Sequence, residues 1–356
     1  MPQTSIPPIE DFLREPIRLV DRPGLPEQYH QFDEDSAMAV RAALAARRPL
    51  LVRGEPGVGK TQLAAAAAKV LKRPIVSCAV DSRTESRDLL WEFDAVLRLA
   101  DAQILGAFPP SRPPSFTTPD EGEPHRDQAG GHRSQRKALR ATLKIRNYLR
   151  PGPLWWAFDW DGATRQARRS RSAIPHHGPD ADPRNGCVVL IDEIDKAETD
   201  VPNGLLEALG SGSFTPMGQS SSQAVTITGP PPLVVITTNE ERTLPNAFLR
   251  RCLVLSLALP EAQDELIKLL VARAKVHFPE EAETFGELFQ EAAEKLVEGR
   301  GIAKEKFITP LPGQAEYLDL VRMVIHLDES AKHTPQTLLD SVKRFVLQKQ
   351  HGDAAS

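Results

Sequence analysis

Cysteines and long apolar runs are both scarce in this sequence. Its 356 residues include three cysteines, Cys78, Cys187 and Cys252, and no two of them form a Cys-x-x-Cys pair. Cysteines far apart in apolar stretches are typical of buried free thiols, which argues against a metal cluster and favours a reducing cytoplasm. The chain has no run of ~18 apolar residues, and residues 1–10 lack a basic-then-apolar signal pattern, so we expect no membrane insertion and no secretion.

The sequence also lacks an excess of charge of one sign. It holds 44 Lys and Arg against 48 Asp and Glu, a formal net charge of −4, so the chain as a whole is not an obvious nucleic-acid binder. Hydrophobic residues make up 40% and charged residues 26%, which is typical of soluble globular proteins rather than disordered ones. A chain of this length is expected to fold into about two domains.

Five short apolar runs predict buried strands, at residues 49–53, 74–80, 187–191, 233–237 and 252–257. A strong helix-forming segment, residues 62–71, lies between the first two runs and completes a βαβ unit. Asp35 and Ser36 offer an N-cap to a further short helix over residues 37–44. The pattern predicts an α/β fold with a five-stranded parallel sheet.

After residue 260 the composition changes to helical periodicity without a strand-like run. Apolar residues recur there at helical spacing and predict the core of a smaller all-α domain: Phe285, Leu288, Phe289, Ala292, Ala293 and Leu296. We expect an N-terminal extension over residues 1–30, an α/β domain over 31–259, the all-α domain over 260–350 and a tail over 351–356.

A long insert, at about residues 98–184, fits neither pattern and contains one predicted helical island at 136–149. Residues 125–171 hold 12 Lys or Arg against three Asp, a local balance of +9, whereas residues 260–356 hold 12 basic and 17 acidic residues. The insert also contains Trp155, Trp156 and Trp160. We interpret this cluster as a small hydrophobic core that pins the insert, and keep a protein-binding hot spot and a base-stacking surface as alternatives.

The first predicted strand runs directly into a phosphate-binding loop. Residues 54–61 match the pattern G-x-x-x-x-G-K-[ST] without a gap, between a predicted strand and a predicted helix. Its glycines let backbone amides surround phosphate, Lys60 can bridge the β- and γ-phosphates of ATP, and the Thr61 hydroxyl can bind Mg2+. The residues expected to bind ATP are Glu55, Pro56, Gly57, Val58, Gly59, Lys60, Thr61 and Gln62.

Polar residues end the third and fourth predicted strands, at the sheet edge where ligands bind in α/β folds. Asp192 would hold Mg2+, directly or through water, and Glu193 would polarise the water that attacks the γ-phosphate. Asn239 either stabilises a turn, a conformation that Asn tolerates well, or orients the attacking water opposite Glu193. Because the two earlier motifs already predict ATP hydrolysis, we favour the catalytic role.

Arg250 and Arg251 follow a short predicted helix and precede the last strand. Arginines at a helix C-terminus are commonly explained by the helix dipole. Apart from Lys60, however, no group identified so far would neutralise the transition state at the γ-phosphate. We therefore favour Arg251 as an arginine finger that acts in trans on a neighbouring subunit.

These elements, in this order and with a helical C-terminal region, resemble the AAA+ ATPases and their MoxR-like branch. Residues 54–61 look like the family's Walker A motif, residues 188–193 like Walker B, Asn239 like sensor 1 and Arg251 like the arginine finger. Residues 195–215 are similar to the MoxR segment in which a helix leads into a hairpin, with residues 226–228 as its return. The resemblance covers roughly residues 30–95 and 186–345.

The resemblance implies Mg-ATP bound in a hexameric ring of identical subunits, with each nucleotide at a subunit junction and the all-α domain as a lid. It also implies remodelling of a protein partner, often a von Willebrand A-domain protein. Two features depart from the family pattern. The insert is long, and Gln314 and Ala315 stand where an arginine, called sensor 2, commonly contacts the γ-phosphate.

Three hypotheses of function follow. The first is a cytoplasmic MoxR-like ATPase that remodels or activates a protein partner. The second is an ATP-dependent assembly switch in signalling or defence, with slow hydrolysis, which the altered sensor 2 and the insert favour. The third is a motor stimulated by nucleic acid; it depends on the basic insert alone, and no recognised nucleic-acid motif supports it.

Overall fold

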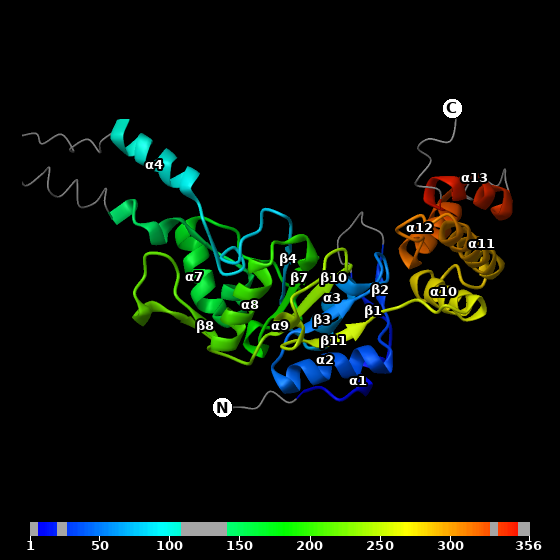
Figure 1. The fold of residues 1–356 in the computed structure, drawn as a ribbon, viewed down its shortest axis with the longest axis horizontal. Coiled ribbons are helices and arrows are strands. Elements are labelled where there is room, and N and C mark those ends of the chain that lie inside the picture. The colour runs from blue at the N-terminus through cyan, green and yellow to red at the C-terminus, as the bar shows by residue number, and fades with distance from the viewer. Residues whose placement is uncertain (1–5, 20–26, 108–140, 328–333, 348–356) are drawn as a thin grey trace, which may run out of the picture. The chain divides into compact units, whose positions relative to one another are not determined.

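The computed structural model describes residues 6–19, 27–107, 141–327 and 334–347. The chain packs into two compact units. Figure 1 shows the fold coloured by residue number. Unit 1 comprises Met1–Thr84, His177–Pro202 and Pro230–Ser356, and unit 2 comprises Glu85–His176 and Asn203–Gly229. The domain boundaries given above stay a proposal.

Unit 1 is built on one parallel sheet of five strands. Their order is β11 (Leu253–Ser256), β3 (Leu50–Arg53), β10 (Leu233–Thr238), β7 (Val188–Asp192) and β4 (Ile75–Ala79). Each lies within, or within one residue of, an apolar run identified in the sequence. The prediction of an α/β fold with a five-stranded parallel sheet is therefore confirmed.

The central strands β3, β10 and β7 are buried on both faces of the sheet. Leu50 and Val52 of β3 lie in one core cluster with side chains of α1 (Glu10–Leu13), α2 (Glu34–Ala46) and α3 (Lys60–Val70). On the opposite face, Leu51, Ile191 and Ile236 have no exposed surface. Because central strands buried on both faces have no room for polar side chains, the polar groups of β7 and β10 are confined to the strand ends.

Helix α2 begins earlier than predicted. Its N-cap is Asp33, whose Oδ1 accepts a hydrogen bond from the backbone N–H of Ser36 at 2.8 Å, while Ser36 Oγ accepts from the N–H of Asp33 at 3.1 Å. Placing the N-cap at Asp35 or Ser36 was therefore wrong, since Ser36 is instead the third helical residue of a capping box.

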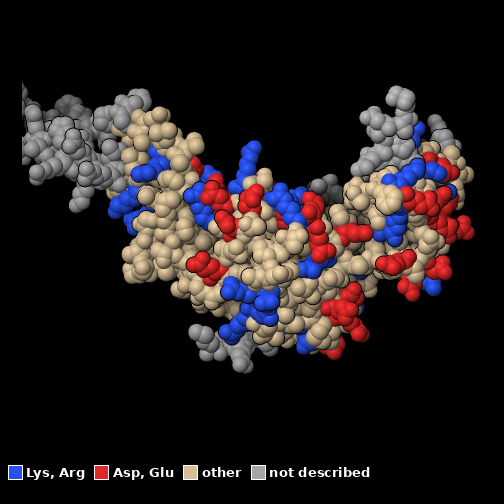
Figure 2. Space-filling model, viewed as in Figure 1, with Lys and Arg blue, Asp and Glu red and all other residues tan. Residues whose placement is uncertain are grey.

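Four helices among the described residues follow the sheet in unit 1, and we call them the lid helices. They are α10 (Gln263–His277), α11 (Gly286–Glu305), α12 (Gln314–Leu327) and α13 (Pro335–Leu347). Their shared core contains the predicted residues from Leu288 to Leu296, with Phe285 packed against it. The expected helical C-terminal region is confirmed, and Figure 2 shows many acidic side chains over these helices on the face in view.

The shorter elements of unit 1 lie around the sheet. Strand β1 (Ile17–Arg18) pairs antiparallel with β2 (Tyr29–His30), and α9 (Asn246–Leu249) precedes β11. The 3-10 turns η2 (Pro183–Asn185) and η3 (Ile194–Lys196) flank β7. No helix in the described part of the chain is long and apolar enough to cross a membrane.

Unit 2 combines most of the insert with the hairpin that follows α8. Strand β5 (Trp91–Phe93) pairs antiparallel with β6 (Leu149–Pro151), and β8 (Ser213–Phe214) pairs antiparallel with β9 (Val225–Thr226), close to the predicted return of the hairpin. Its other elements are α4 (Ala95–Ala107), η1 (Ile145–Tyr148), α6 (Pro153–Phe158), α7 (Trp160–Ser170), η4 (Ser221–Gln223) and α8 (Asp200–Ser211), which begins in unit 1.

The helical island predicted for residues 136–149 is partly wrong. Residues 136–140 lie outside the described residues, as does the basic stretch from 125 to 140. From Ile145 the chain forms a 3-10 turn, and Leu149 begins β6. The reason is that Leu149, which is fully buried, pairs with Phe93 of β5, a contact that the helical spacing cannot show.

Phe214 is the hub of an aromatic core in unit 2. Its ring centroid lies 5.6 Å from that of Trp91, 5.8 Å from Trp155 and 5.9 Å from Phe158. Trp155 and Trp156 are only 4% and 3% exposed. The interpretation of the tryptophan cluster as a hydrophobic core is therefore supported, and the hairpin supplies the ring at its centre.

Two of the three cysteines are buried free thiols, as expected. Burial raises the pKa of the Cys187 thiol to about 12 and that of Cys252 to about 11, so neither forms a reactive thiolate near neutral pH. Among the described residues, no group of three or more His, Cys, Asp or Glu side chains is placed to hold a metal ion.

The Phe214→Ala substitution should lower the free energy of unfolding of unit 2 by about 3 kcal/mol, because it removes the ring that three other aromatic side chains contact. Chemical denaturation followed by tryptophan fluorescence measures this change. Phe307→Ala is the matched control, since Phe307 is 92% exposed. Equal denaturation midpoints for the two variants would contradict the central role of Phe214.

Candidate functional site

The phosphate-binding loop connects β3 to α3 and depends on glycine at three positions. Gly54, Gly57 and Gly59 have φ values of +150°, +80° and +98°, which residues with a side chain rarely adopt. A Cβ at Gly54 would also lie 2.2 Å from the carbonyl oxygen of Leu257. Gly59 is the N-cap of α3, so the partial positive charge of that helix end faces the loop.

A cavity of about 270 Å³ lies at the carboxyl edge of the sheet. Three structural elements line it: the loop with the start of α3, the ends of β7 and β10, and the first turns of α12. The residues from the latter two are Asp192, Glu193, Thr237, Asn239, Gln314, Ala315 and Leu318. Of the residues predicted to bind ATP, Glu55 and Val58 do not line this cavity, and the other six do.

Lys60 is held in the site by three acceptors. Its Nζ donates hydrogen bonds to Asn239 Oδ1 at 2.7 Å and to the carbonyl oxygens of Gly54 at 2.7 Å and Glu55 at 2.9 Å. The residue is 6% exposed, and burial lowers the pKa of Lys60 from its usual 10.5, against the attraction of nearby carboxylates such as Asp192. The bonds to these acceptors compensate for much of the cost of burying the ammonium group.

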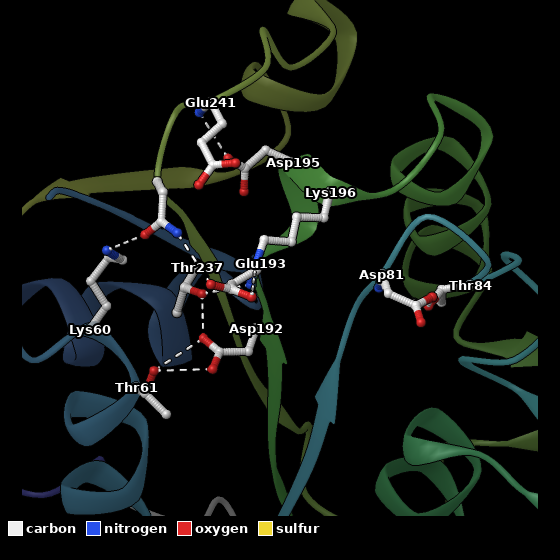
Figure 3. Close-up of polar contacts among 11 residues, drawn as sticks. Lys60, Thr61, Asp81, Thr84, Asp192, Glu193, Asp195, Lys196, Thr237 and Glu241 are labelled. Carbon is white, nitrogen blue, oxygen red and sulfur yellow. Dashed lines mark hydrogen bonds and ion pairs between the residues drawn. The ribbon is translucent and has the colours of Figure 1, made fainter. Parts of the chain in front are cut away.

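The side chains of Thr61 and Asp192 point toward one another and are in contact, as Figure 3 shows. Thr61 Oγ1 lies 3.1 Å from both carboxylate oxygens of Asp192. A hydroxyl and a carboxylate are hard oxygen donors of the kind Mg2+ prefers, and Mg2+ usually completes its shell with substrate phosphates and water. The pair therefore fits a Mg2+ ion bound together with phosphate, and this role of the two residues stays a prediction.

Thr237 is a site residue that the sequence analysis missed. Its Oγ1 donates a hydrogen bond to Asp192 Oδ1 and accepts one from the backbone N–H of Glu193 at 2.9 Å. Ile236 pairs with Ile191 in the parallel ladder, which brings the following residues of β10 and β7 alongside. The role of Thr237 is visible only from the register between β10 and β7. In the sequence, Thr237 is one more β-branched residue at the end of an apolar run.

Glu193 follows β7 with a left-handed backbone, at φ 59°, a conformation that costs energy for a residue with a side chain. Its Oε1 accepts from Asn239 Nδ2 at 3.2 Å and its Oε2 from Lys196 Nζ at 2.6 Å. Lys196 was also missed by the sequence analysis. Nearby, the buried Asp195 accepts from the backbone N–H of Glu241 at 2.9 Å and fixes the loop after β10 (Figure 3).

Arg251 stands apart from this cavity. Its side chain is exposed and is not among the residues lining the cavity. Its backbone carbonyl accepts a hydrogen bond from Arg48 Nε at 3.0 Å, and Arg48 Nη2 donates to the carbonyl of Cys252 at 3.2 Å. The structure therefore joins Lys60, Asp192, Glu193 and Asn239 in one site, and it leaves Arg251 outside the site of its own chain.

Residues 49–108 match the family described as AAA domain (dynein-related subfamily), a span that contains β3, the phosphate-binding loop and α3. No curated protein matches the sequence. Among solved structures, the chain is similar to a proline-to-glycine mutant of RuvB from Thermotoga maritima, with 15% identity and a TM-score of 0.42 over 87% of this chain and 68% of that chain. The match therefore shows that residues 49–108 resemble an AAA domain, and the glycine loop between β3 and α3 lies within that span.

Proposed function

We propose that the chain is a MoxR-like AAA+ ATPase that couples Mg-ATP hydrolysis in an oligomeric ring to remodelling of a protein partner. The observation that carries this proposal is the convergence of Lys60, Thr61, Asp192, Glu193 and Asn239 on one cavity. Phosphoryl transfer requires a cation for the phosphates, oxygen ligands for Mg2+, a base for water and a group that orients that water. The five side chains supply these four functions.

Binding of ATP would rearrange the contacts of Lys60. In the structure its Nζ donates to Asn239 Oδ1. The γ-phosphate of a nucleotide bound at the loop would compete with Asn239 for this ammonium group. A phosphate oxygen is the stronger partner because a bond between two charged groups is shorter and stronger than one to an amide. Asn239 is then released to orient the attacking water. Bound Mg2+, held at Thr61 and Asp192, would neutralise charge on the phosphates.

Glu193 is the general base in this mechanism. Its carboxylate adjoins Asn239, so a water between the two can be held by the amide and lose its proton to the carboxylate. Thr237 keeps this arrangement in place by binding both Asp192 and the N–H of Glu193. Lys196 donates to the other carboxylate oxygen, so it orients the Glu193 side chain.

Arg251 completes the proposal as a finger supplied by a neighbouring subunit. Its exposed position outside the cavity is compatible with reaching a nucleotide bound to another copy of the chain. The ring, its hexameric state and a von Willebrand A-domain partner rest on the resemblance to the MoxR branch. An arginine that enters only from a neighbour makes hydrolysis depend on assembly.

A second candidate function, the assembly switch with slow hydrolysis, is favoured by one feature of the cavity. The lid helices contribute Gln314, Ala315 and Leu318 to the cavity, and none of these carries a charge for the γ-phosphate. Fast turnover stimulated by a protein supports the remodelling ATPase, whereas slow turnover with ATP-dependent assembly supports the switch.

The burial of Trp155 and Trp156 weighs against the nucleic-acid motor, because indoles packed in a core cannot stack on bases. Turnover measured with and without DNA or RNA tests that hypothesis directly.

Glu193→Gln should bind ATP with near-native affinity and lower kcat at least 100-fold, because an amide cannot accept the proton from water. Lys60→Ala should weaken ATP binding roughly 30-fold or more, because the phosphates lose a buried cation. Fluorescence titration with a labelled ATP and a phosphate-release assay measure the two effects. Normal turnover by Glu193→Gln would refute the mechanism.

Mixing two inactive variants tests the position of Arg251. Arg251→Ala and Glu193→Gln should each abolish turnover, but an equal mixture should recover about a quarter of wild-type activity, since that share of junctions joins an intact Glu193 to an intact Arg251. The measurement is ATPase activity after the subunits have exchanged. If the mixture stays inactive although mixed rings are detected, Arg251 does not act in trans.

Thr237→Val should lower kcat/KM roughly tenfold and raise the Mg2+ concentration required for half-maximal turnover, because it leaves the buried N–H of Glu193 without its acceptor and frees Asp192. Thr237→Ser keeps the hydroxyl and should retain most of the activity. Mg2+ titrations of steady-state turnover compare the two. Equal curves for the Val and Ser variants would show that the hydroxyl has no role.

A further inference from the structure

Within unit 1, the start of α12 packs directly on the phosphate-binding loop. A Cβ at Gly57 would lie 2.9 Å from the Cβ of Ala315, and a Cβ at Gly313 would lie 3.3 Å from the carbonyl oxygen of Pro56. Contacts this short exclude any larger side chain at Gly57. The loop and the first turn of α12 therefore fit closely together.

Arg300 of α11 joins the two sides of this contact. Its Nη1 donates to the carbonyl oxygen of Pro312, just before α12, at 2.5 Å, and its Nη2 donates to Glu55 Oε2 in the loop at 3.0 Å. The side chain of Arg300 is 8% exposed, whereas that of Glu55 is 42% exposed. Since a buried guanidinium is costly without partners, these two bonds fix where Arg300 lies.

The other arginines that hold the lid helices do so away from the loop. Arg273 of α10 donates to the carbonyl of Gln31 beside β2 at 3.0 Å, and Arg322 pairs with Asp319 inside α12 at 2.9 Å. Among the ion pairs of the described residues, Arg300 with Glu55 is the one that joins a lid helix to the phosphate-binding loop.

We propose that Arg300 is a positioning residue that couples the lid helices to the nucleotide through Glu55. Neither side chain lines the cavity, so the pair acts behind the loop rather than on the phosphates. By holding Pro312 and Glu55 together, Arg300 keeps Gln314 and Ala315 over the cavity. Arg300 thereby links the lid helices to the phosphate-binding loop, while α12 itself contributes no arginine to the cavity.

The pair should govern nucleotide affinity, a consequence that rests on the proposed function. When the pair is broken, the first turn of α12 is free to leave the loop, and a bound nucleotide loses the contacts that the lid helices provide. An interaction energy typical of two contacting side chains, lost when this pair is broken, corresponds to roughly a tenfold loss of affinity for the nucleotide. The change should appear as weaker binding, with the chemistry at Glu193 left intact.

A double-mutant cycle tests the proposal on the full chain. Arg300→Gln, Glu55→Gln and the double variant are compared by hydrogen–deuterium exchange without nucleotide and by the affinity for ATPγS. Each single variant should speed exchange at residues 312–318 and at the loop, and should weaken ATPγS binding roughly tenfold. The double variant should be no worse than Arg300→Gln. The matched control Arg322→Gln removes an arginine paired inside the lid and should leave the loop unchanged.

Glu55→Gln keeps the test decisive if Arg300→Gln fails to fold, because Glu55 is half-exposed and belongs to the other side of the contact. Faster exchange at residues 312–318 in that variant supports the coupling. Unchanged exchange there, or additive effects of the two substitutions, overturns it. Exchange without nucleotide does not depend on ATP hydrolysis, so a failed ATPase assay would refute the proposed function without affecting this result.

Discussion

Strand β10 lies between β3 and β7 and is hydrogen-bonded in parallel to both. This position places the end of β10 beside the phosphate-binding loop on one side and the acidic end of β7 on the other. Thr237 and Asn239 consequently contact partners from both neighbours: Thr237 holds Asp192, and Asn239 bridges Lys60 and Glu193. A register shift of one residue would turn these side chains to the opposite face and separate the groups.

The charged side chains of the site are held by contacts with one another and with Asn239. Lys60 is buried with its Nζ bound to three oxygens, and Glu193 has one carboxylate oxygen on Asn239 and the other on Lys196. Asn239 therefore contacts both Lys60 and Glu193, the cation and the general base of the proposed mechanism. In that mechanism, a phosphate that captures Lys60 must change the contacts of Asn239, so nucleotide binding and the orientation of Glu193 are linked through one amide.

The sequence predicted the sheet and most of the site because these depend on local patterns. Buried strands are apolar along their whole length, and the glycine loop between β3 and α3 has few alternatives. Residues whose roles depend on tertiary contacts were missed. Thr237 acts through the register of two strands distant in sequence, and Arg300 reaches Glu55 from another helix. Phe214 is likewise central to unit 2 because its ring contacts aromatic side chains from other segments of the chain. The N-cap of α2 was misplaced because Ser36 can serve either as an N-cap or as the third helical residue of a capping box.

The central claim is that Lys60, Thr61 and Asp192 bind Mg-ATP at the edge set by β10. A crystal structure of the Glu193→Gln protein with Mg-ATP tests this most directly. We predict the γ-phosphate on Lys60 Nζ, with the bond from Lys60 to Asn239 broken, and Mg2+ about 2.1 Å from Thr61 Oγ1. A nucleotide bound elsewhere, or a Lys60 that still bonds Asn239 while ATP is present, would contradict the account.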